Sequence, residues 1–223
     1  MKTAVITGVS QGIGKALAQK FLAEGYQVIG TTTDGTASYT HPHLHIVQLD
    51  LRSPESITGA ASAVLTTVNA IDVLINNAGV LLDEEETTIN PQLLRDTLEV
   101  NVIGPADFTN RVKTAIVPGG HLINISSTAG SLTLANEHGS HYPHHYPAYK
   151  ISKAAVNMAT RTFAMELAGK ATVSAVHPGW VRTAMGGDDA DMSPEESAQD
   201  IFAFAISHPE TGQFWFRGEK LPW

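Results

Sequence analysis

The chain contains no cysteine. This absence excludes disulfide bonds, thiolate nucleophiles and cysteine metal ligands together, and it is typical of a reducing cytoplasm, where we expect the protein. Long apolar runs are also missing. The apolar start, MKTAVITG, ends at Gly8, and no window approaches the roughly 18 unbroken apolar residues that a membrane span needs. We therefore expect neither a targeting segment nor a membrane partner.

Positive charge is scarce as well. Lys and Arg number 14 against 22 Asp and Glu, which gives a formal net charge of −8 at pH 7. A negative surplus opposes binding to nucleic-acid backbones and to anionic lipids, so we predict no nucleic-acid partner. The chain does have apolar residues, 43% of 223, which is enough to fill the core of one domain.

Short apolar runs alternate with longer helical patterns. Helices are expected at 90–116 and 147–168 among others, between strand-like runs that read TAVITG, YQVIGTT, LHIVQLDL, IDVLINNAG, GGHLINISS, TVSAVHPGWV and GQFWF. Such alternation predicts a parallel sheet covered on both faces. We predict a single-domain α/β fold over residues 1–223, a doubly wound Rossmann-type sheet of about seven strands. The segment at about 184–194 is expected to form a small substrate lid.

A glycine-rich stretch, TGVSQGIG at residues 7–14, lies between the first expected strand and helix. This is the context of a phosphate-binding loop, in which backbone N–H groups and a helix N-terminus face the anion. The spacing is TGxxxGxG rather than GxGxxG, and an ordinary glycine-rich turn is the alternative. The predicted dinucleotide contacts here are Gly8, Ser10, Gln11, Gly12, Ile13 and Gly14.

Two later strand ends carry further candidates for the cofactor. Asp50, followed by Leu51, ends the third strand and could accept a hydrogen bond from an adenine amino group. The alternative is a solvated carboxylate. The fourth strand ends in NNAG, whose Asn77, Ala78 and Gly79 would let an adenosine lie against the backbone; a plain turn is the alternative there.

The order TGxxxGxG, NNAG, strand-end serine and YxxxK resembles the short-chain dehydrogenase/reductase family over essentially the whole chain. The stretches YKISKAAVNM, HPGWVRTAMGG and GQFWFRGEKLPW are similar to the branch of C-factor and the Sniffer-type carbonyl reductases. The resemblance implies a nicotinamide-dependent oxidoreductase. In the family a tyrosine acts as general acid, a lysine one helical turn later lowers its pKa and binds the ribose, and a serine holds the substrate oxygen. An asparagine positions water for proton relay.

Residue by residue, this resemblance assigns the catalytic roles to Asn101, Ser127, Tyr149 and Lys153. Ser126, beside Ser127, would line the cofactor side or cap the strand. Without the family, Asn101 would read as a helix-interior asparagine that bonds the backbone. The resemblance also implies that the nicotinamide end of the cofactor contacts Tyr149, Lys153, Pro178, Gly179, Val181 and Thr183.

Two tyrosines precede a lysine by four residues, Tyr146 before Lys150 and Tyr149 before Lys153. The residue before a proline is pushed out of the helical region, and proline is favourable at the first helical position. The helix is therefore expected to begin at Pro147, which leaves Tyr146 outside it. Tyr149 and Lys153 then lie on one helix face, one turn apart, and are the predicted pair.

The interval from Ser127 to Tyr149 is longer than is typical of the family, and the excess is rich in histidine. We interpret this loop, 138–145, as a border of the substrate pocket. A metal site is the alternative, and it predicts activity that a chelator removes. No metal ligand is assigned.

The cofactor preference depends on the end of the second strand, VIGTTTDGT. An acid at this point favours NAD(H), and a basic residue without the acid favours NADP(H). Thr32 takes the place of the acid and Thr33 the place of the base, while Asp34 comes two residues later. Because hydroxyl groups can bond a 2′-phosphate without repelling it, the sequence favours NADP(H) over NAD(H). Asp34 turned onto the ribose would reverse this preference.

The sequence thus predicts hydride transfer between a nicotinamide cofactor and a small carbonyl or alcohol substrate, with Tyr149 as general acid/base. A dinucleotide-binding regulatory or signalling protein of the C-factor type, with little turnover, is the alternative function. Relatives pair through the two long helices, here 91–116 and 147–168, which leaves a homodimer and a homotetramer both open.

Overall fold

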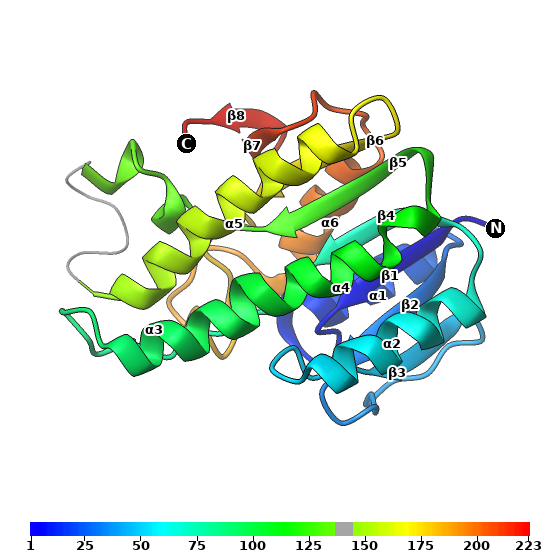
Figure 1. Cartoon of the computed structure of the whole chain (residues 1–223), viewed down its shortest axis with the longest axis horizontal. Helices are drawn as coiled ribbons and strands as arrows, with labels where there is room; N and C mark the ends of the chain where they lie inside the picture. The colour runs from blue at the N-terminus through cyan, green and yellow to red at the C-terminus, as the bar shows by residue number, and fades with distance from the viewer. Residues whose placement is uncertain (137–144) are drawn as a thin grey trace.

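The computed structural model describes residues 1–136 and 145–223, which form one eight-stranded sheet with helices on both faces (Figure 1). In order across the sheet the strands are β3 (Leu44–Gln48), β2 (Gln27–Thr32), β1 (Thr3–Thr7), β4 (Ile71–Asn76), β5 (Ile116–Ile125), β6 (Ala171–Val176), β7 (Gln213–Phe216) and β8 (Glu219–Leu221). Each pairing is parallel except that of β7 with β8. The predicted doubly wound α/β fold is confirmed.

The strand β8 is an addition to the seven expected strands. It follows β7 through Arg217 and Gly218, whose φ angles are 49° and 81°. Positive φ at both central residues is what the tightest two-residue hairpins require. The strand has three residues, Glu-Lys-Leu, and nothing in so short and polar a segment marks it as a strand.

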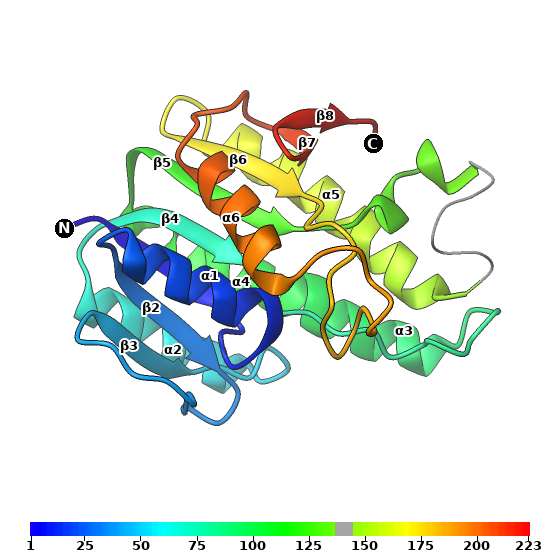
Figure 2. The same cartoon turned by 180° about the vertical axis from the view of Figure 1, so that it is seen from behind.

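Helices cover the sheet in two layers. One face carries α1 (Gly12–Ala23) and α6 (Pro194–Ala205), and the other carries α2 (Pro54–Thr67), α4 (Gly104–Val112) and α5 (Pro147–Glu166) (Figure 1, Figure 2). Phe21 of α1 and Phe202 of α6 pack against each other in the apolar core on the first face, with their rings edge to face and the ring centroids 4.9 Å apart. The apolar core on the other face contains Phe108 of α4 and Phe163 of α5. The sheet is therefore held between two apolar layers.

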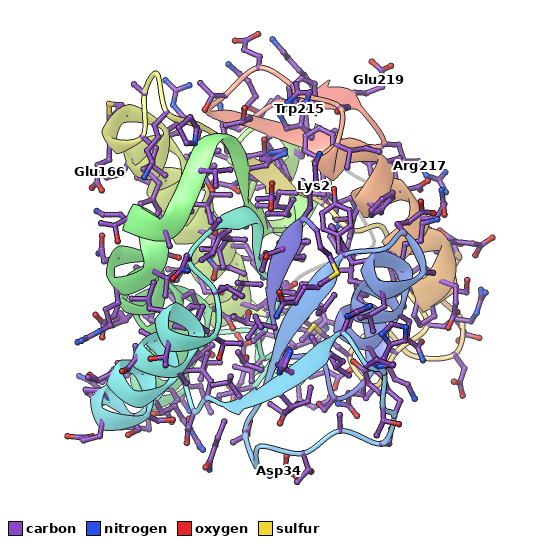
Figure 3. All side chains as sticks on the ribbon, turned by 90° about the vertical axis from the view of Figure 1, so that its right-hand side faces the viewer. Lys2, Asp34, Glu166, Trp215, Arg217 and Glu219 are labelled. Atoms are coloured by element: carbon purple, nitrogen blue, oxygen red, sulfur yellow. The ribbon has the colours of Figure 1, made fainter. Side chains whose placement is uncertain are left out.

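Many charged side chains lie on the surface of the molecule. Asp34, Glu166 and Glu219 are exposed and project from the edges of the molecule in Figure 3. Within residues 1–136 and 145–223, none of the helices has the length and apolar character that crossing a membrane requires.

The single long helix expected at 90–116 is interrupted. It consists of α3 (Pro91–Leu98), the π turn η1 (Glu99–Ile103), α4 and a 3₁₀ turn, η2 (Lys113–Ala115). At the junction a Cβ on Gly104 would lie 2.3 Å from the carbonyl oxygen of Leu51, so the helix runs directly against another backbone segment. Short π segments often occur at functional sites, and this one contains Asn101.

The strand order reverses between β1 and β4. From β1 the chain proceeds through β2 to β3 at one edge, returns to β4 beside β1, and continues toward the other edge. In such sheets ligands bind at the carboxyl ends of the strands at this reversal. The glycine loop follows β1 and the NNAG motif follows β4, so both lie at this position.

Candidate active site

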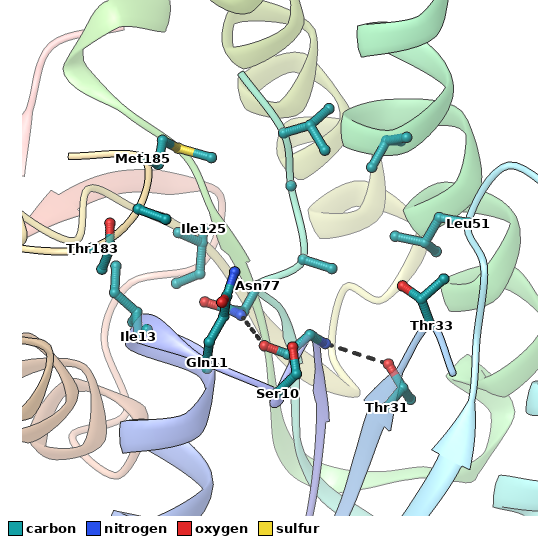
Figure 4. A pocket seen from close by; sticks show the side chains of 18 of the residues that line it. Ser10, Gln11, Ile13, Thr31, Thr33, Leu51, Asn77, Ile125, Thr183 and Met185 are labelled. Carbon is teal, nitrogen blue, oxygen red and sulfur yellow. Dashed lines mark hydrogen bonds between the residues drawn. The ribbon is translucent and has the colours of Figure 1, made fainter. Parts of the chain in front are cut away.

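A cavity of about 870 Å³ lies at the carboxyl ends of β1 and β4. Figure 4 shows Ser10, Gln11 and Asn77 near one another, with Thr33 on one side and Thr183 on the other. Most of the residues predicted to bind the cofactor line this cavity: Gly8, Ser10, Gln11, Gly12, Ile13, Gly14, Thr32, Thr33, Asp50, Leu51, Asn77, Ala78, Gly79, Tyr149, Lys153, Pro178 and Thr183.

The glycine loop turns so tightly that it has no room for side chains at its glycines. Gly8 has a φ of 73°, and a Cβ on Gly14 would lie 2.0 Å from the Gly8 carbonyl oxygen. The side-chain amide of Asn77 donates to the carbonyl oxygens of Thr7 at 2.9 Å and Gly8 at 3.2 Å. Gln11, at the N-cap of α1, makes no side-chain cap. The first N–H groups of α1 can therefore donate to an anion in the cavity, which fits a pyrophosphate.

The segment after β6 approaches the glycine loop from the other side. A Cβ on Gly12 would lie 3.2 Å from the Thr183 methyl group. Gly179, with a φ of 90°, and Val181, which forms a β-bridge with Met192, are not among the described residues that line the cavity. Cofactor contacts by these two residues stay a prediction.

Hydrogen bonds from side chains to backbone carbonyl groups hold the loop 184–194 in place. The Trp180 indole N–H donates to the Gly186 carbonyl oxygen at 2.8 Å, and Arg182 donates to the Ala190 carbonyl oxygen at 2.8 Å. The loop borders the cavity through Ala184, Met185 and Pro194.

At the carboxyl end of β2, Asp34 is engaged by its own loop. Its carboxylate accepts from the Thr36 N–H at 3.0 Å, the Thr36 hydroxyl at 2.9 Å and the Thr32 hydroxyl at 3.2 Å. These bonds, the Thr36 N–H first, lower the pKa of Asp34. Asp34 is not among the described lining residues, whereas Thr31, Thr32 and Thr33 are.

Asp50 is paired with Arg52, which is not among the predicted cofactor contacts. The Arg52 side chain donates to both carboxylate oxygens, at 3.0 Å and 2.9 Å, and these bonds lower the pKa of Asp50. Arg52 lines the cavity together with Asp50. Its position directly after the LDL stretch was the available signal, because residues at strand ends face such crevices.

The helix α5 begins at Pro147, as predicted, and Tyr146 precedes it with a φ of 65°. Tyr149 lies in the first turn and is 7% exposed. The Lys153 ammonium lies 5.4 Å from the centroid of the Tyr149 ring and donates to the Ile125 carbonyl oxygen at 2.9 Å. Burial lowers the pKa of Lys153 to about 8. Tyr149 and Lys153 line the cavity, whereas Tyr146 is not among its described lining residues.

Asn101 connects the π turn to the NNAG segment. Its side-chain oxygen accepts from the Val80 N–H at 2.8 Å, and its amide donates to the Val80 carbonyl at 2.9 Å and to the Ser152 hydroxyl at 3.0 Å. A Cβ on Gly79 would lie 3.2 Å from Asn101 Oδ1 and 3.8 Å from Lys153 Nζ. The structure therefore brings Gly79, Asn101 and Lys153 to one place.

The two serines that follow β5 have different surroundings. Ser126 lines the cavity, and its hydroxyl donates to the side-chain oxygen of Asn157 at 2.5 Å. Ser127 is 2% exposed, its hydroxyl oxygen accepts from the Ala129 N–H at 3.1 Å, and it is not among the described lining residues. The catalytic role of Ser127 stays a prediction. Asn157, missed from the sequence, could have been found by its four-residue spacing from Lys153.

Most of the predicted histidine loop, 138–145, lies outside the described residues, including His138, His141 and His144. His145 is described, and its ring centroid lies 5.9 Å from that of Tyr146. Within the described part of the chain, no three histidine or carboxylate side chains are grouped as a metal ion would require. The metal-site alternative on this loop remains untested.

A glycine-rich loop at a helix N-terminus and a tyrosine–lysine pair lie at one cavity of a doubly wound sheet, an arrangement typical of dinucleotide-dependent oxidoreductases. Residues 2–194 match the family model for short chain dehydrogenases. The chain belongs to the short-chain dehydrogenase family, as its motifs predicted.

Similar proteins include members of the predicted branch. The C-signal protein of Myxococcus xanthus is 34% identical over 164 residues, which cover 69% of this chain and 93% of that protein. The carbonyl reductase Sniffer of D. melanogaster has a TM-score of 0.87 at 25% identity, with full coverage of both chains. The NADPH-bound carbonyl reductase from chicken fatty liver has a TM-score of 0.90 at 26% identity and covers 100% of this chain and 94% of its own. The resemblance to this branch is confirmed.

Proposed function

We propose that the protein is an NADP(H)-dependent oxidoreductase that interconverts a carbonyl and an alcohol, with Tyr149 as general acid and base. The observation that carries the proposal is the Tyr149–Lys153 pair at the same cavity as the glycine loop. The loop and the N-terminus of α1 would hold the phosphates of the cofactor, and Lys153 its ribose. A bound nicotinamide would supply or accept the hydride.

Residues of the chain itself would transfer the proton. Carbonyl reduction places negative charge on the substrate oxygen, which Tyr149 would neutralise by donating its phenolic proton. The nearby ammonium of Lys153 favours the ionised tyrosine and so eases this donation. A pKa of about 8 leaves Lys153 mostly protonated at neutral pH. Ser127 would hold the substrate oxygen, and Asn101 would hold the water that returns the proton.

The lining of the cavity supports a small, largely apolar substrate. Val80, Leu82 and Met185 contribute apolar side chains to it. Met185 belongs to the loop 184–194, which we propose as the lid over the substrate.

Two observations favour NADP(H) over NAD(H). The carboxylate of Asp34 is bonded within its own loop, so it is not presented to a ribose in the manner of NAD-binding acids. Thr33 and Arg52 line the cavity, and the Thr33 hydroxyl and the Arg52 guanidinium could bond a 2′-phosphate, whereas the hydroxyl of Thr32, which also lines it, donates to Asp34. The chicken carbonyl reductase, a structural relative, is described with NADPH bound.

Replacement of Tyr149 by Phe tests the proposal. We expect turnover to fall at least about a hundredfold, because proton transfer by a placed side chain contributes roughly that much. The reaction would be followed by consumption of NADPH or NADH with panels of aldehydes, ketones and quinones, and cofactor binding by fluorescence titration. Tyr146→Phe is the matched control and should retain activity. Retained turnover in Tyr149→Phe, or its loss in Tyr146→Phe, would refute the assignment.

A dinucleotide-binding signalling protein is the second candidate, and the similarity to the C-signal protein favours it. It predicts tight cofactor binding by the wild-type chain without turnover of any carbonyl in the panels. The same measurements therefore separate the two functions.

A further inference from the structure

The helix that carries Tyr149 and Lys153 lacks a cap of its own. The N-cap residues of α2, α3 and α6 are Ser53, Asn90 and Ser193, and each accepts a backbone N–H with its side chain. The N-cap of α5 is Tyr146, whose backbone is left-handed and whose side chain makes no cap. The first N–H groups of a helix need acceptors when they are buried. The acceptors for α5 come from another part of the chain.

A turn at 83–86, after the NNAG segment, supplies them. Asp83 is 1% exposed, and its Oδ2 accepts from the Ala148 N–H at 2.6 Å. The carbonyl oxygen of Glu86 accepts from the Tyr146 N–H at 3.2 Å, and the Glu86 N–H donates to the Asp83 carbonyl at 3.1 Å. The turn therefore holds the start of α5 at two points, on either side of Pro147.

A buried aspartate is a costly way to cap a helix. The second carboxylate oxygen of Asp83, Oδ1, is buried without a hydrogen-bond partner in the described structure. Burying a charge with one hydrogen bond costs free energy that an exposed serine or asparagine cap avoids. Its burial therefore offsets part of the stability that a helix cap contributes. A carboxylate does hold a backbone N–H in a short, charge-assisted bond, which fixes position closely.

We propose that Asp83 is a positioning residue that fixes the first turn of α5, and with it the hydroxyl of Tyr149. Ala148, which Asp83 holds, is the residue directly before Tyr149. This inference rests on the proposed function, in which Tyr149 donates a proton to the substrate. A displacement of reacting groups by about 1 Å can cost roughly a hundredfold in rate.

Asp83→Ala, Asp83→Asn and a remote control, Asp72→Ala, test the proposal. Asp72 makes the same kind of bond, from its Oδ2 to the Thr3 N–H at 2.8 Å, but in the amino-terminal part of β4, away from the site. In Asp83→Ala we expect kcat to fall roughly tenfold to a hundredfold, with KM and NADPH affinity near those of the wild type. Asp83→Asn keeps an acceptor oxygen and should restore most of kcat. Asp72→Ala should lower Tm without lowering kcat.

Wild-type kcat in Asp83→Ala, or an equal loss of kcat in Asp72→Ala, would overturn the proposal. If Asp83→Ala does not fold, Asp83→Glu takes its place: it keeps the charge but displaces the acceptor, so its kcat should be lower than that of Asp83→Asn. The reverse order would show that charge, not position, matters, and would also overturn the proposal.

Hydrogen exchange separates a failure of this inference from a failure of the proposed function. Amides of the peptide 145–156 should exchange faster in Asp83→Ala than in the wild type, and should not change in Asp72→Ala. This readout needs no turnover. If the wild type reduces no carbonyl, the proposed function fails, and unchanged exchange in Asp83→Ala would separately refute the positioning role.

Discussion

The glycine loop after β1 and the turn after β5 are built alike. In each, a glycine faces backbone at a distance that excludes a side chain: a Cβ on Gly14 would lie 2.0 Å from the Gly8 carbonyl oxygen, and a Cβ on Gly130 would lie 2.4 Å from the carbonyl carbon of Lys153. The first contact shapes the glycine loop, which we call the phosphate loop after its proposed role. The second sets α5, and therefore Lys153, against the turn that contains Ser127.

An asparagine secures each of these contacts. Asn77 donates to the Gly8 carbonyl oxygen and Asn157 to the Gly130 carbonyl oxygen, both at 3.2 Å. The two regions differ in their reach along the chain and in charge. The Gly8–Gly14 contact closes within one strand–turn–helix unit of neutral groups, whereas the Gly130–Lys153 contact joins distant segments and includes a buried ammonium. The Gly8–Gly14 contact is therefore local, although the asparagine that secures it comes from the end of β4, 69 positions away, whereas the Gly130–Lys153 contact itself joins two distant segments.

Gly14→Ala and Gly130→Ala should break the two regions separately, with the largest effects. Overpacking typically costs about 1–3 kcal/mol, and a clash with backbone lies at the upper end, so Gly14→Ala should weaken NADPH binding roughly a hundredfold. Gly130→Ala displaces α5 and should reduce kcat far more than it reduces NADPH affinity. Steady-state kinetics and fluorescence titration measure both.

The control for these variants is Gly59→Ala in α2, where an added Cβ meets nothing within 4 Å. Alanine is the better helix former, so this variant should gain up to about 1 kcal/mol in stability. If Gly14→Ala and Gly130→Ala reduce kcat and NADPH affinity to the same degree, the division into two regions is wrong.

The same contrast explains what the sequence could predict. The TGxxxGxG stretch forms the expected turn between β1 and α1, and α5 begins at Pro147 after Tyr146, so the predicted conformation of both segments is confirmed. Strand β8 and the π turn at Asn101 were missed because neither has a local pattern. The π turn accompanies the approach of α4 to the Leu51 backbone, a contact that no periodicity reports.

The candidate site was predictable to the same extent. Motif positions found most of the residues that line the cavity, because strand ends meet at one edge of a parallel sheet. Asp83 was not found, since its partner Ala148 lies 65 positions away and an acidic residue in a polar loop has no distinguishing signal. Contacts across such distances depend on how the helices pack, which the sequence alone does not state.

The buried ammonium of Lys153 should make the catalytic region sensitive to pH, unlike the phosphate loop. Its pKa falls from 10.5 to about 8 in the folded chain, so between these values the unfolded chain binds more protons. The free energy of unfolding should therefore rise with pH across this window, by about 3 kcal/mol. Below pH 8 the full cost of burial is present.

Chemical denaturation of the wild type and of Lys153→Met, both without cofactor, measures this effect. When the free energies of unfolding of the two proteins are subtracted at each pH, the contributions of the other titrating groups cancel. Lys153→Met should be the more stable protein near pH 7, less the contribution of the lost bond to Ile125, and this advantage should disappear at alkaline pH. A difference independent of pH would mean that the ammonium is not desolvated.

The smallest effects should come from the asparagines, and they sharpen the comparison because both replacements are chemically the same. Asn77→Ala and Asn157→Ala each remove an amide that bonds a carbonyl oxygen, at a cost of about 1–2 kcal/mol. Asn77→Ala should raise the Kd of NADPH about tenfold and leave kcat at saturating cofactor near the wild-type value. Asn157→Ala also removes the nearer of the two acceptors of the Ser126 hydroxyl and leaves only the Lys153 carbonyl oxygen at 3.4 Å, so it should lower kcat while the Kd of NADPH stays nearly constant. Should the two variants exchange these phenotypes, the phosphate loop and the catalytic turn would not be the separate units that their contacts describe.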